Sequence, residues 1–233
     1  MEINSYRKEI NKSLEDGIKE NIIDTSTDYL EIGLDGIMES LLSESFLENI
    51  PWFKTAYGAY KGVVAYRDLA FMRKLIIFLQ VLHKDEFDSK KHEEYLISLS
   101  SDPKEKAKIL NSLTEIIDKI LGGEKAHYLA NLFRSHINGK ISWIEFIGFS
   151  ECLNNLNPIA LNKETAKRVA ELDYKADLMK GDIDSIIPFY LSVGLGLWDG
   201  ERFELTKNGR LFIKCCFGTN PQPRPCMYGV QIG

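Results

Sequence analysis

The chain has 233 residues, a formal net charge of −5 and 44% hydrophobic residues, which is enough apolar content for one good-sized domain or two small ones. Charged residues at 27% and aromatic residues at 11% exclude a disordered chain, a collagen-like chain and a coiled-coil rod. Four cysteines without a C-x-x-C pair, and a start without a secretory signal, predict a reducing, cytoplasmic location with neither a zinc site nor a redox motif.

The first 50 residues carry a net charge of −8 and predict two helices. Apolar residues at every fourth position indicate an amphipathic helix from Tyr6 to Ile23, which Gly17 weakens. A second helix is expected from Tyr29 to about Phe46, and Pro51 suits the first turn of a third.

Residues 50 to 82 form a nearly continuous apolar run and predict one or two helices with a break near Arg67-Asp68. Residues 51 to 91 carry a net charge of +4, in contrast to the acidic residues before them. The acidic residues either fold back onto this basic stretch or leave it to an anionic partner, such as lipid head groups or nucleic acid. Charge pairing within the chain is the favoured alternative.

The same segment has features typical of membrane helices. Gly58 and Gly62 have the spacing that lets helix backbones approach closely in a membrane, and the interface would suit Trp52, Tyr57, Tyr60 and Tyr66. Residues 50 to 66 contain Lys54 and Lys61 and fall short of the about 20 apolar residues of a spanning helix. A single copy is not expected to insert, although the lysines of several copies could line a pore. The pattern favours a buried core hairpin over a membrane or pore-forming role, and both over another protein interface.

The middle of the chain predicts ordinary amphipathic helices. They are expected over residues 87 to 121, 126 to 137 and 143 to 156, with Gly122-Gly123 and Asn138-Gly139 between them. Ser100 to Pro103 is a further start signal within the first stretch, and Ser142 is expected to cap the third helix. Asn157-Pro158 ends that helix and marks the predicted domain boundary.

Residues 134 to 145 invite comparison with a calcium loop. Gly139 and Glu145 fall at its sixth and twelfth positions. Arg134 and His136 occupy the first and third positions, where calcium requires oxygen ligands. A helix-turn-helix without calcium is therefore expected.

The four histidines lack the spacing of a metal site on a helix. His83 and His92 lie among acidic residues, where a solvated charged loop is expected rather than a metal cluster. The sequence has no G-x-S-x-G, phosphate-binding glycine loop or H-E-x-x-H motif and selects no catalytic residue. We expect a protein that is not an enzyme, with no cofactor and no metal.

The C-terminal residues predict two helices, a β-hairpin and a last helix. The helices are expected over 163 to 179 and 185 to 193, the strands over 194 to 198 and 202 to 205, and the last helix from a Thr206 cap to Phe217. This order is similar to the end of a winged-helix unit, in which Lys207, Arg210 and Lys214 could contact phosphates. Residues 161 to 233 carry a net charge of only +1, so protein contact or effector sensing is favoured over duplex DNA binding.

The predicted fold class is mainly α. Residues 1 to 157 are expected to form a helical domain that contains the apolar basic segment 50 to 82. Residues 158 to 217 are expected to form a small winged-helix-like α+β domain, and residues 218 to 233 a flexible tail.

Four short motifs resemble a family of poorly characterised bacterial helical proteins found among mobile phage-defence genes. The motifs are Ile50-Pro51, Arg67-Asp68, Lys74 to Leu79 and Ile141 to Phe146, within roughly residues 45 to 155. They are similar to those of the membrane effector of the Hailong anti-phage system. The resemblance implies a partner nucleotidyltransferase whose DNA oligomers hold an oligomeric, channel-like effector silent. No ligand-binding residue matches one for one, so none is carried over.

These observations lead to a hypothesis of a non-enzymatic antiviral defence effector in the bacterial cytoplasm. It would homo-oligomerise and act on the inner membrane as a pore or ion channel, under the control of an anionic ligand such as an oligonucleotide. The membrane or oligomer contacts would be Trp52, Tyr57, Gly58, Tyr60, Gly62, Val63 and Tyr66. The anionic-ligand contacts would be Lys54, Lys61, Arg67, Arg73 and Lys74. The alternative is a soluble helical regulator or adaptor in which residues 50 to 82 are core and the winged-helix-like domain binds protein or DNA.

Overall fold

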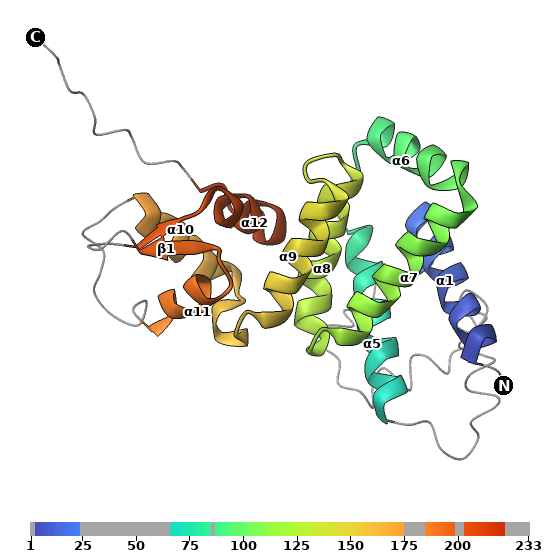
Figure 1. Ribbon diagram of the computed structural model, residues 1–233, viewed down its shortest axis with the longest axis horizontal. Helices are drawn as coiled ribbons and strands as arrows, with labels where there is room; N and C mark the ends of the chain where they lie inside the picture. The colour runs from blue at the N-terminus through green and yellow to red at the C-terminus, as the bar shows by residue number, and fades with distance from the viewer. Residues whose placement is uncertain (1–2, 24–65, 85–86, 175–184, 199–202, 222–233) are drawn as a thin grey trace, which may run out of the picture. The chain divides into compact units, whose positions relative to one another are not determined.

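The computed structural model describes residues 3–23, 66–84, 87–174, 185–198 and 203–221, and this part of the chain is mainly helical, as predicted (Figure 1). The helices predicted over residues 29 to 46 and from Pro51, and residues 222 to 233 of the predicted tail, lie outside the described residues. By its internal contacts the chain divides into two compact units, residues 1 to 146 and 147 to 233, called here unit 1 and unit 2.

Unit 1 is a group of helices around α5. Its helices are α1 (Ile3–Lys19), α5 (Tyr66–Leu82), α6 (Ser89–Ser101), α7 (Pro103–Lys119) and α8 (Gly122–Ile137), and the division between the units falls within α9 (Trp143–Asn155). The most extensive packing is between α5 and α8, while α1 lies against α7 and α5. Burial of Ile10, Leu14 and Ile18 confirms the apolar stripe predicted on the first helix.

Gly17 explains how α1 approaches α5 so closely. A Cβ atom at this position would lie 2.6 Å from Leu79 Cδ2, so a larger residue would need Leu79 to move. Gly17 weakens α1 through its conformational freedom, but its lack of a side chain lets α1 pack closely against α5.

The breaks between the middle helices follow local backbone chemistry. Asp102 separates α6 from α7, and its side chain accepts hydrogen bonds from the N–H groups of Lys104 (2.8 Å) and Glu105 (3.4 Å). The predicted stop at Gly122-Gly123 is wrong in detail, because α7 already ends at Lys119 and the glycine pair begins α8. The turn at Gly139 is confirmed, with φ of 68° in the left-handed region that glycine adopts readily.

Unit 2 combines short helices with one antiparallel hairpin. After η1 (Pro158–Ala160) come α10 (Lys163–Tyr174), α11 (Ile187–Ser192), β1 (Gly196–Trp198), β2 (Phe203–Leu205) and α12 (Lys207–Phe217). The strands pair with Gly196 opposite Leu205 and Trp198 opposite Phe203. In the core, Phe149 packs edge-on against Phe212, with ring centroids 5.7 Å apart.

Candidate functional site

The described half of the apolar basic segment is a core helix. Helix α5 begins at Tyr66, close to the predicted break, and is continuous through Arg67-Asp68. From Phe71 to Leu82, the residues no more than 8% exposed are Phe71, Met72, Lys74, Leu75, Ile76, Ile77, Phe78, Leu79, Gln80, Val81 and Leu82. A helix buried on all sides in this way belongs to the interior of unit 1.

Lys74, a predicted anion-binding residue, lies inside this core. It is only 7% exposed, and its Nζ donates hydrogen bonds to the carbonyl oxygens of Asp118 (2.6 Å) and Ile120 (3.1 Å). These carbonyls lie where α7 ends, and the last carbonyls of a helix lack partners within it. The ammonium group therefore satisfies a helix terminus and stabilises unit 1.

Arg134 serves the end of α5 in a similar way. Its Nη1 donates to the carbonyl oxygens of Val81 (2.7 Å) and Leu82 (3.4 Å), and its Nη2 donates to Asn131 Oδ1 (2.7 Å). The guanidinium is positioned by α8 and ties that helix to the last turn of α5. The buried position and these bonds give Arg134 a structural role where a calcium loop would need an oxygen ligand.

Only some of the other residues predicted to contact a membrane, another copy or an anionic ligand lie within the described part of the chain. Trp52, Lys54, Tyr57, Gly58, Tyr60, Lys61, Gly62 and Val63 lie outside the described residues. Tyr66 and Arg67 belong to the first turn of α5, while the side chain of Arg73 is half-buried. Among the described residues, no helix is both long enough and apolar enough to cross a bilayer.

Glu145, at the last position of the calcium-loop pattern, is part of a capping box. Its Oε2 accepts hydrogen bonds from the Ser142 N–H (2.7 Å) and hydroxyl (2.8 Å), and its own N–H donates to Ser142 Oγ (3.2 Å). This confirms the predicted Ser142 cap at the start of α9. Within the described residues, no group of three or more His, Cys, Asp or Glu side chains could hold a metal ion.

His83 and His92 do not belong to a solvated loop, which corrects the sequence-based expectation. Both side chains are half-buried, and their Nε2 atoms lie 2.6 Å from the Gly17 carbonyl oxygen and 2.9 Å from the Ile18 carbonyl oxygen, respectively. The amphipathic pattern could not reveal these contacts, because they join residues more than sixty positions apart.

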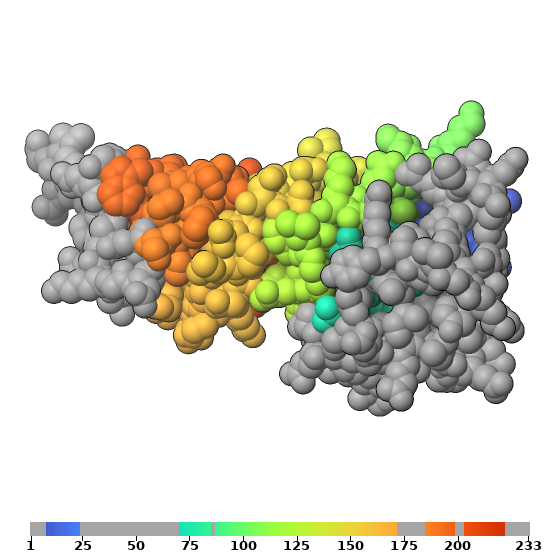
Figure 2. Space-filling view, turned by 90° about the horizontal axis from the view of Figure 1, so that it is seen from below, coloured from blue at the N-terminus to red at the C-terminus, as the bar shows by residue number. Residues whose placement is uncertain are grey.

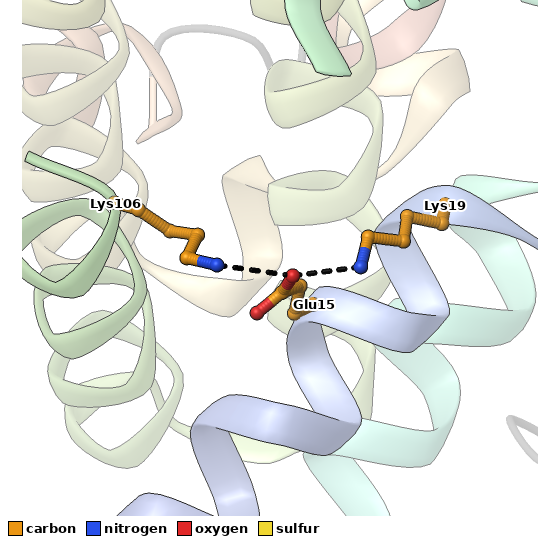
Figure 3. A network of polar contacts seen from close by, with 3 residues as sticks. All are labelled: Glu15, Lys19 and Lys106. Carbon is orange, nitrogen blue, oxygen red and sulfur yellow. Dashed lines mark hydrogen bonds and ion pairs between the residues drawn. The ribbon is translucent and has the colours of Figure 1, made fainter. Parts of the chain in front are cut away.

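A polar network holds the middle of α1 on α7. Glu15 Oε1 lies 2.7 Å from Lys19 Nζ and 3.2 Å from Lys106 Nζ, as Figure 3 shows. Hydrogen bonds to both lysines lower the pKa of Glu15 against the opposing effect of its burial. Nearby, Asn11 donates to Asn111 Oδ1 (2.8 Å) and accepts from the hydroxyl of Thr114 (3.0 Å).

The junction of the hairpin and α12 explains the Leu-Thr-x-x-Gly pattern. Thr206 Oγ1 accepts the N–H of Gly209 (2.9 Å) and its hydroxyl lies 3.2 Å from the Leu195 carbonyl oxygen, so it caps α12 and ties it to the residue before β1. A Cβ atom on Gly209 would lie 1.8 Å from that carbonyl oxygen. Only glycine lets the helix approach the backbone this closely.

Of the three basic residues expected to contact phosphates, one is paired with an acidic residue. Lys207 and Lys214 are exposed on α12. Arg210 Nη2 lies 3.2 Å from Glu204 Oε1 on β2, so its charge is paired with an acid of the same hairpin-helix junction. This pairing reduces the positive potential available to a polyanion.

Two apolar residues that are adjacent in the sequence of β1 have exposed side chains. Leu197 is 41% exposed and Trp198 is 47% exposed, and the surface in Figure 2 shows residues 185–198 in orange. The sequence predicts a strand at these residues and no functional site. The sequence did contain a signal for this exposure. Neighbouring strand residues point to opposite faces, so two adjacent large apolar residues cannot both face one core.

Comparison with known proteins gives no match for this chain among protein-family models, curated proteins or solved structures.

Proposed function

We propose that the protein acts by binding other macromolecules, as a helical regulator or adaptor, and carries out no chemistry of its own. The observation that carries this proposal is the burial of α5, since residues from Phe71 to Leu82 form the core of unit 1. Lys74 and Arg134 support it, because their positive charges serve helix termini inside the same unit. The described part of the apolar basic segment is thus accounted for by folding.

Unit 2 is the part proposed to meet the partner. Its helix, hairpin and helix order supports a winged-helix-like reading, with the hairpin as the wing. Exposed Trp198 on this hairpin favours a protein partner, since tryptophan is enriched at the centres of protein interfaces. The Arg210–Glu204 pair and the near-neutral charge of residues 161 to 233 disfavour duplex DNA.

A photo-crosslinking residue at position 198 tests this role of the hairpin in living cells. We expect a defined crosslinked protein from this position, and a much weaker one when the same residue replaces Ile159. Ile159 is a matched control because it is also in unit 2 and is 65% exposed. Equal crosslinking from both positions, or none from position 198, would contradict a hairpin interface.

The defence-effector hypothesis is a second candidate, favoured by the motifs that resemble that family. In this account the protein homo-oligomerises on the inner membrane in answer to an anionic, oligonucleotide-like ligand. Because α5 is buried from Phe71 onward, membrane contact would fall to residues 50 to 65, and Lys74 would not be among the ligand contacts. Membrane-potential measurements separate this candidate from the first.

A further inference from the structure

We draw no further inference here: the strongest candidate, the apolar surface patch on the first turn of α9 where Ile144 is 83% exposed beside the half-buried Trp143, carries none because nothing in the described part of the chain shows what covers it.

Discussion

Replacing Gly209 by alanine should destabilise unit 2 by about 3 kcal/mol or more, the upper range for overpacking. The new Cβ would lie 1.8 Å from the Leu195 carbonyl oxygen and 2.8 Å from the carbonyl carbon, so backbone has to move. That movement would also disturb Thr206, which caps α12 and meets the same oxygen. Urea unfolding followed by circular dichroism, with limited proteolysis to locate the opened unit, measures the change.

Gly148→Ala is the matched control in the same unit. Gly148 lies within α9, and a Cβ there would meet no atom within 4 Å. Alanine should stabilise this helix by about 0.5–1 kcal/mol, because it loses less conformational freedom on folding. Similar effects at both positions would contradict the close approach of α12 to the Leu195 carbonyl.

Lys74→Met should destabilise unit 1 by about 2–6 kcal/mol, since two carbonyl groups lose a charged donor and each unsatisfied group costs about 1–3 kcal/mol. The carbonyls are those of Asp118 and Ile120 at the end of α7, and methionine fills a similar volume without a donor. Thermal and urea unfolding of the purified variant measure this loss.

Lys108→Met provides the comparison for a lysine on the surface. Its Nζ lies 3.3 Å from Glu105 Oε1, with side chains 69% and 52% exposed, and such pairs contribute at most about 1 kcal/mol. An unfolding free energy that falls equally in both variants would contradict the buried role of Lys74. A stable Lys74→Met protein would return this residue to the candidates for ligand binding.

The helix starts that depend on neighbouring residues in the sequence were the most predictable features. Thr206 caps α12 and Ser142 caps α9, as expected from residue type and position alone. The start signal predicted at Ser100 to Pro103 is also confirmed, because Asp102 caps α7 and divides residues 87 to 121 into two helices. The winged-helix resemblance remains a prediction, since the observed elements establish only helices and a two-stranded hairpin.

The chemistry of the candidate residues was less predictable, because it depends on distant partners. Lys74 looked like an anion-binding residue, yet its ammonium group reaches the end of α7, more than forty residues away in the sequence. His83 and His92 looked solvated among acids, yet they meet α1. Periodicity reports which face of a helix is apolar but not which helix end a long polar side chain reaches.

The most direct test of the binding-protein account uses inducible expression in bacteria, with a membrane-potential dye and cell fractionation. The intact chain is compared with three variants: the double variant Gly58→Leu, Gly62→Leu, a chain lacking residues 50 to 65, and the control Gly148→Leu. Gly148 is a suitable control because an added side chain there meets open space. Because α5 is core, we predict no depolarisation by any of the four and no accumulation in the membrane fraction. Depolarisation by the intact chain and the Gly148→Leu control, lost in the other two variants, would contradict the account and favour the membrane effector.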